Sequence, residues 1–450
     1  MRIPQMKLVA LAMASLASQV VLAESDATQQ QAVDKKTTTS ETVPLLFGSP
    51  VPATTGAAAT NPAQQVLSPE YSMAPSAAVA AQGRGVRFAN GVFVKPAVTT
   101  ALSHNDNLIG VETGKIATTI FTIRPEIVAE LKRREDVYSL SYAGNYGWNW
   151  SSSADNFMQH LLNLQAENVL DARLRTKWAV GYQISSDPRG STANSGATEP
   201  NRWRAPQLSA GLTYGATGAQ GRLAVDGSWM QKRYDNNRAL TEQSDVDIAS
   251  VSTSFYYRFM PKTSALVELR NTWSDYTMAT SLQDNTDTRI YGGLTWEATA
   301  KTTGSIRLGR AYKNFETQSA TYKDASRMSW EAQVEWAPLT YSTVQMAATR
   351  GFADSTGVGS YLINTGLNVN WQHRWSQLYA SNVAVGRVMT TYGNSVREDQ
   401  VDTYGFGFSR VLSRYSALGL NWTHTTRDVT GAVGFNFERN VTMLSLQSSL

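Results

Sequence analysis

Hydrophobic and polar residues alternate one by one over long stretches of the chain after about residue 90. The clearest stretch is Asp171 to Ser186, where one set of alternate positions is apolar and the other is polar or basic. The apolar set is Ala172, Leu174, Trp178, Val180, Tyr182 and Ile184, and the opposite set includes Arg173, Arg175, Lys177, Gly181 and Gln183. Because successive side chains of a β-strand point to opposite faces, the pattern predicts strands with one apolar and one polar face.

The length of these stretches bears on the kind of β protein. Further examples are Asp136–Trp150, Ser326–Trp336, Ser360–Trp371 and Thr403–Phe408. Many are about twice as long as the roughly five or six residues of an average strand in a soluble sheet, and they suit tilted strands that cross a bilayer. We therefore predict an all-β fold, a transmembrane antiparallel outer-membrane β-barrel. A soluble β-sandwich, whose strands also alternate, is the competing fold.

The connections between the stretches alternate between long and short. Long polar links include His104–Lys115 and Ser186–Ala205, and short ones include Lys132–Glu135 and Ala337–Leu339. Outer-membrane barrels have long external loops and short periplasmic turns. The count of links predicts about 18 strands, with both ends of the barrel sequence on the periplasmic side.

Aromatic residues gather near the ends of the predicted strands. Trp296, Trp336 and Trp371 lie beside short turns, whereas Trp150 and Trp422 lie nearer the long loops. Amphipathic rings prefer the headgroup level of a membrane, so two girdles favour the barrel over the sandwich.

The first 90 residues differ from the rest. Residues 1–23 have a basic start, an apolar stretch and small residues before the expected cleavage, which predicts a secretory signal rather than a buried N-terminal helix. Residues 24–90 are rich in Ala, Thr and Pro, which predicts a disordered low-complexity periplasmic segment. Residues 91–450 would form the barrel, and the expected location is the bacterial outer membrane.

Composition excludes several other classes. The chain has 450 residues, 17% charged residues, no Cys and a net charge of +4. After the first 25 residues it contains no run of about 18 apolar residues, which excludes a bundle of transmembrane helices. Without Cys it has neither a disulfide scaffold nor a Cys-ligated metal. No run of basic or acidic residues indicates nucleic acid as a partner. The four His are widely spaced and no Gly-x-Ser-x-Gly elbow occurs, so we expect no enzyme activity, metal or cofactor.

Basic residues on the predicted inward faces are the candidate functional residues. They are Arg173, Arg175, Lys177, Arg270, Arg289, Arg307 and Arg327. Acidic residues on the same faces include Glu268, Glu297, Glu331 and Glu335. Clustered cations in a channel concentrate anions, so these residues would suit passage of an acidic polymer or solute. The alternative is that the charges pair across the lumen and hold the shape of the barrel.

Two segments carry a resemblance to a known family. Gly91–Ser103 runs into His104-Asn105-Asp106-Asn107-Leu108 and continues through the hairpin Glu126–Tyr146, and Phe437-Glu438-Arg439-Asn440 leads into the last predicted strand. Over Gly85 to Leu450 the chain resembles the putative β-barrel porin 2 family, whose members often accompany exopolysaccharide biosynthesis and export genes. Leu450, where an aromatic residue is commoner, departs from the usual barrel ending.

The resemblance implies a passive conduit for export of an exopolysaccharide across the outer membrane. It would bring as partners the polysaccharide, a periplasmic polysaccharide-export component and the surrounding outer-membrane lipid. The resemblance brings no catalytic or binding residues with it. Two other functions are left open by the residues: a porin for small solutes, anionic ones included, and a structural or surface-display barrel.

Overall fold

A computed structural model describes residues 85–191, 197–299, 301–355, 359–432 and 436–450. The predicted signal sequence, residues 1–23, and the predicted low-complexity segment up to residue 84 lie outside the described residues. No helix in the described ranges is long and apolar enough to cross a membrane.

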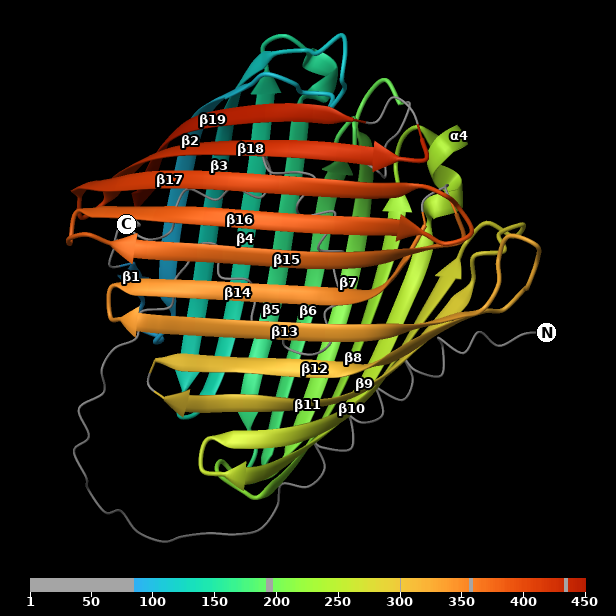
Figure 1. The fold of residues 1–450 in the computed structure, drawn as a ribbon. Helices are drawn as coiled ribbons and strands as arrows, with labels where there is room; N and C mark the ends of the chain where they lie inside the picture. Colours follow the sequence, from blue (N-terminus) through green and yellow to red (C-terminus); the bar gives the residue numbers. More distant parts are fainter. Residues whose placement is uncertain (1–84, 192–196, 300, 356–358, 433–435) are drawn as a thin grey trace, which may run out of the picture.

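In the described part of the chain, 18 antiparallel strands form a closed barrel (Figure 1), which confirms the predicted fold class and strand number. The strands are β2 (Phe93–Asn105), β3 (Thr118–Arg133), β4 (Asp136–Asn149), β5 (Phe157–Val169), β6 (Leu174–Asp187), β7 (Asn201–Tyr214), β8 (Gly221–Tyr234), β9 (Val246–Met260), β10 (Thr263–Tyr276), β11 (Asn285–Thr299), β12 (Thr302–Phe315), β13 (Ala325–Leu339), β14 (Ser342–Asp354), β15 (Tyr361–Arg374), β16 (Tyr379–Tyr392), β17 (Glu398–Ser413), β18 (Ser416–Thr430) and β19 (Phe437–Ser449). Each strand pairs with its neighbours in sequence, and β19 closes the barrel on β2 from Val441↔Asn105 to Ser449↔Ala97. The short strand β1 (Val86–Arg87) pairs with the start of β2.

The register puts alternate residues on two different surfaces. Leu444 in β19 lies opposite Leu420 in β18 and Leu102 in β2, and its exposed fraction is 50%. The next residue, Ser445, has an exposed fraction of 2%. Since apolar side chains exposed to this extent form a continuous layer around the barrel, the outer surface faces lipid and the polar set faces the lumen.

The connections fall into a short set at one end of the barrel and a long set at the other (Figure 1). The long connections hold the small helices η2 (Ser153–Asp155), α4 (Arg238–Thr241) and η3 (Glu242–Ser244). The turn predicted at Ala337–Leu339 is placed wrongly, because β13 continues to Leu339 and the turn follows it. The register shifts between Trp336 and Leu339, and this irregularity accommodates Pro338, which has no backbone N–H to donate to a ladder.

Candidate functional site on the inner wall

The inner wall is lined by small and polar side chains, as β15 illustrates. Its apolar residues Leu367 and Val369 belong to the outer set, and the residues between and beside them are Gly366, Asn368 and Asn370. Such a surface offers hydroxyls, amides and charges to water, which suits an aqueous lumen rather than a dry core.

The predicted basic residues fall into two separate groups. Arg270, Arg289, Arg307 and Arg327 lie on the four adjacent strands β10 to β13, and Arg270 is the direct cross-strand partner of Arg289. Arg175 and Lys177 lie on β6, four strands away from β10 around the barrel. Arg173 lies in the β5–β6 turn, one residue before the strand begins. Whether any of these seven residues contacts a solute stays a prediction.

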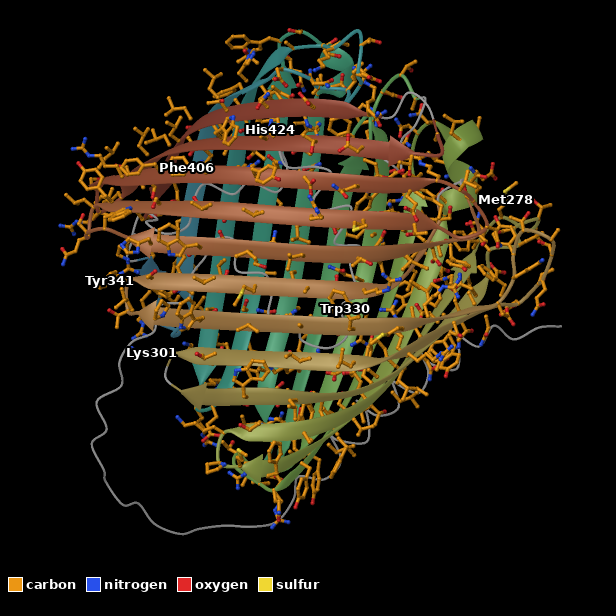
Figure 2. The ribbon with its side chains drawn as sticks, viewed as in Figure 1. Met278, Lys301, Trp330, Tyr341, Phe406 and His424 are labelled. Carbon is orange, nitrogen blue, oxygen red and sulfur yellow. The ribbon has the colours of Figure 1, made fainter. Side chains whose placement is uncertain are left out.

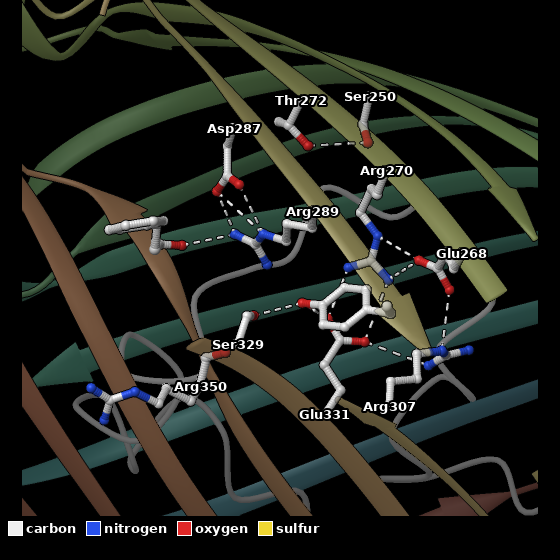
Figure 3. A network of polar contacts seen from close by, with 12 residues as sticks. Ser250, Glu268, Arg270, Thr272, Asp287, Arg289, Arg307, Ser329, Glu331 and Arg350 are labelled. Atoms are coloured by element: carbon white, nitrogen blue, oxygen red, sulfur yellow. Dashed lines mark hydrogen bonds and ion pairs between the residues drawn. The ribbon is translucent and has the colours of Figure 1, made fainter. Parts of the chain in front are cut away.

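Glu268 is the centre of the larger group (Figure 3). Its side chain is fully buried on β10, between Arg270 and Arg307. The Nη2 of Arg270 donates to its Oε1 at 2.5 Å, and the Nε of Arg307 lies 3.1 Å from its Oε2. Two guanidinium groups thus compensate one buried carboxylate, which keeps the carboxylate from being stranded in the wall.

Glu331 on β13 joins the same network from the opposite side. The Nη1 of Arg270 donates to its Oε1 at 2.9 Å, and the Nη1 of Arg307 lies 3.5 Å from its Oε2. Two arginines and two glutamates from β10, β12 and β13 therefore form one connected network of ion pairs (Figure 3). This arrangement supports, for these residues, the alternative in which lumen charges pair with one another.

Arg289 and Arg327 are held differently. The Nη2 of Arg289 donates to Asp287 Oδ2 at 2.7 Å and to the carbonyl oxygen of Phe352 at 3.0 Å. Arg327 donates to the hydroxyl of Tyr361 at 3.4 Å and to the carbonyl oxygen of Ser326 at 2.9 Å. Arg327 is exposed and has no ion pair with another described residue, so it adds positive charge near the long-loop end of the wall.

Of the two strand residues of the β6 group, Lys177 is exposed on the inner side and Arg175 is partly buried. Lys177 pairs with Glu167 at 2.8 Å, and both side chains are more than half exposed. Arg175 donates to Thr217 Oγ1 at 2.9 Å and to the carbonyl oxygen of Gly215 at 3.1 Å, in the β7–β8 turn. The Arg175 contacts tie β6 to a short turn, whereas the Lys177–Glu167 pair joins β6 to β5 and is weak because it is exposed to water.

A second buried network was missed by the sequence analysis. Asp399 on β17 accepts from Arg397 at 2.7 Å, from Arg427 at 2.5 Å and from the hydroxyl of Tyr392 at 2.9 Å. Arg427 lies on β18, on the same face as Thr423 and Thr425. Arg427 was not among the candidate residues predicted from the sequence, although its position five residues after the outer residue Trp422 puts it in the inward-facing set of β18.

Part of the β6–β7 connection reaches this network across the mouth of the barrel. Arg189 donates to Asp155 at 2.8 Å and to Ser152 at 3.2 Å, both in the β4–β5 connection. The carbonyl oxygen of Gly190 accepts from Arg427 at 3.3 Å. A Cβ at Gly190, whose φ is +79°, would clash with the carbonyl of Ile109 in the β2–β3 connection. Residues 188–191 therefore fold inward and narrow the mouth on the side of β18.

Among the described residues, no group of three or more His, Asp or Glu side chains is arranged to hold a metal ion.

Comparisons with known proteins agree with this architecture. The family described as putative beta-barrel porin 2 matches residues 84–449. A comparison with curated proteins found no match. Similar solved structures include Pseudomonas aeruginosa OccK2 (OpdF), at 10% identity and a TM-score of 0.46 over 79% of this chain and 98% of that chain.

Two further solved structures are similar to the same extent. The outer membrane protein OpdK from Pseudomonas aeruginosa has 11% identity and a TM-score of 0.45 over 79% of this chain and 99% of that chain. A BenF-like porin from Pseudomonas fluorescens Pf-5 has 12% identity and a TM-score of 0.45 over 79% and 99%.

Proposed function

The chain belongs to the putative beta-barrel porin 2 family of the bacterial outer membrane, and on that premise we propose that its barrel conducts small polar solutes by diffusion. The function is that of a porin, with no catalytic step. The small-solute reading is preferred to export of an exopolysaccharide, which stays a prediction from the family resemblance.

The observation that carries the proposal is an 18-stranded barrel with a polar inner wall. Barrels of about 8 strands are filled by their own side chains, whereas barrels of 16 to 18 strands leave room for a water-filled channel. The inward residues of β15, Gly366, Asn368 and Asn370, are small or neutral and hydrogen-bonding, which suits weak contact with passing solutes.

Two features of the wall favour small solutes over a polymer. Residues 188–191 reach inward at the mouth and are fixed there by Arg189 and Arg427. Across β10 to β13 the four arginines face three carboxylates, Glu268, Asp287 and Glu331, so most of the charge is neutralised within the wall. We propose that the remaining positive charge, together with Arg175 and Lys177, gives a weak preference for small anions.

The test is conductance of the full chain reconstituted in a planar bilayer, with folding verified by different gel mobility before and after boiling. We expect stepwise channels and a reversal potential in a KCl gradient that indicates weak anion preference. Replacing Arg175 and Lys177 by Glu should abolish that preference, with Arg202→Glu on the outer surface of β7 as the matched control. A folded barrel that carries no current under any condition would overturn the proposal.

Deletion of the gene separates this proposal from polymer export. Secreted polysaccharide should stay unchanged while uptake of small hydrophilic solutes slows. Loss of secreted polymer would instead support the export function and a periplasmic export partner.

A further inference from the structure

Three arginines of one wall, on β12, β14 and β16, belong to the outer, lipid-facing set of residues, which is an unusual place for a cation. Arg310 lies opposite Ile290 and Met328, whose exposed fractions are 49% and 61%. Arg387 lies opposite Leu367 and is itself 52% exposed. Residues directly opposite in a ladder share a face, so these arginines belong to the outer set.

Arg350 follows the same rule. It lies opposite Trp330 in β13 and Thr365 in β15, and Trp330 alternates with the outer residues Met328 and Trp336. Trp330 is labelled on the front of the barrel in Figure 2, as is His424 on β18. The view therefore faces the wall that carries the three arginines.

The three arginines lie at one height in the membrane. Each strand of this wall that rises from a short turn has a basic residue eight steps from its first residue: Thr302 to Arg310 in β12, Ser342 to Arg350 in β14, Tyr379 to Arg387 in β16, and Ser416 to His424 in β18. Eight steps along a strand tilted by about 40° rise about 20 Å. The apolar band of such barrels is about 25 Å tall, so the row lies near the outer-leaflet headgroups.

The other side of the barrel differs at the same position. Eight steps from the first residue, β10 has Asn271 and β8 has Trp229. At this height the row therefore lies on β12–β18 and not on β8 or β10. The outer arginines of β7, Arg202 and Arg204, lie nearer the long loops and each has a carboxylate nearby.

The arginines are weakly neutralised by the protein. Arg310 donates to Ser326 Oγ at 3.0 Å and Arg350 donates to Thr365 Oγ1 at 2.8 Å, and neither has an ion pair with another described residue. Only Arg387 has a carboxylate, Asp402, with a contact of 2.6 Å. A charged side chain at the edge of the hydrocarbon region is costly when no anion neutralises it. The excess positive charge of the row therefore favours binding of an anion from outside the chain.

We propose that Arg310, Arg350 and Arg387 form a docking surface for a phosphate-bearing lipid headgroup of the outer leaflet. Arginine is suited to phosphate because its planar guanidinium donates two parallel hydrogen bonds. Neighbouring members of the row are two strands apart, roughly 10–13 Å, so one bulky headgroup with more than one phosphate can be held by two arginines. The surface lies outside the lumen and is independent of solute passage.

Native mass spectrometry of the detergent-purified full chain tests the proposal, with phosphorylated lipopolysaccharide as the probe. Replacing all three arginines by Gln should weaken its binding by at least about tenfold, since several charge-assisted hydrogen bonds are lost. The matched control replaces Arg202 and Arg204, exposed outer residues of β7 that already have carboxylates nearby, and should bind as the unmodified chain does.

Two further measurements test whether the phosphate groups of the lipid are what is bound, and whether free phosphate can replace the lipid. Enzymatically dephosphorylated lipopolysaccharide should bind the unmodified chain as weakly as the triple variant binds the intact lipid, and inorganic phosphate alone should not compete at millimolar concentration. If the triple variant fails to show heat-dependent gel mobility, Arg310→Gln and Arg350→Gln are measured singly, each with an expected loss of several-fold. Unchanged binding in folded variants, or equal binding of the dephosphorylated lipid, would overturn the proposal.

Discussion

At the scale of single residues, the buried carboxylate of Glu268 shows how the wall tolerates charge. It has no exposed surface and depends on Arg270 and Arg307 for compensation. A carboxylate can accept from both guanidinium groups, whereas an amide offers one oxygen and places two donors against cations. The network is therefore more sensitive to loss of one member than an exposed ion pair would be.

Glu268→Gln should lower the free energy of unfolding by about 3–5 kcal/mol, because two buried arginine contacts lose their counter-charge. Urea unfolding of the barrel in lipid vesicles, followed by tryptophan fluorescence, measures the change. Glu335→Gln, on β13, is the control, since Glu335 is exposed, and it should change stability by no more than about 0.5 kcal/mol. Equal effects of the two substitutions would contradict a structural role for the buried network.

At the scale of the elements, alternation predicted strands well wherever the strand crosses lipid. β6 and β15 follow the predicted faces because apolar residues are needed on one side only. The prediction was weaker at the long-loop ends, where β7 begins at Asn201 although Ser186–Ala205 was expected to be a loop. There the strand leaves the lipid, both faces contact water or polar loops, and the two-residue signal disappears.

For the candidate site, the sequence predicted which face of a strand a residue occupies but not which residues pair with each other. Alternation assigned Arg270, Arg289, Arg307 and Arg327 to the inward-facing set, and each lies next to an exposed apolar residue of its strand; their role in lining a solute path stays a prediction. Alternation did not name Arg350 or Arg387, whose facing follows from the ladder, where they lie opposite Trp330 and Leu367. Which carboxylate pairs with which arginine depends on register between strands, and a single sequence does not contain that information.

The inward segment 188–191 offers a prediction for an element. Arg189→Ala removes the bonds to Asp155 and Ser152, and charge-assisted bonds of this kind contribute about 1.5–3 kcal/mol each. The docked arrangement should become at least about tenfold less favoured, so single-channel conductance should rise and fluctuate more. Arg202→Ala, which removes an exposed ion pair at 3.7 Å, should leave conductance unchanged. A current that does not change in the first variant would show that this segment does not restrict the mouth.

At the scale of the whole molecule, closure of β19 on β2 leaves the barrel without a free edge. Where a strand crosses the lipid, neighbouring residues along it therefore face two different surroundings, lipid outside and water inside. Val369 and Asn368 on β15 are such a pair. Val369 lies opposite Met346 and Val385 on the outer surface, below the row of arginines, while Asn368 is exposed on the inner wall. The same charge placed on either residue should therefore have opposite consequences.

Val369→Arg should destabilise the barrel by about 2–4 kcal/mol, because it places an unpaired cation near the middle of the bilayer. Asn368→Arg should cost less than about 1 kcal/mol, because water in the lumen solvates the new charge, and it should shift the reversal potential toward anions. Unfolding in vesicles and bilayer conductance measure the two effects on the same preparations. If the Asn368 variant were the less stable of the two, the residues assigned to lipid and to water would have to be exchanged throughout β15, and the polar lumen on which solute passage depends would be lost with them.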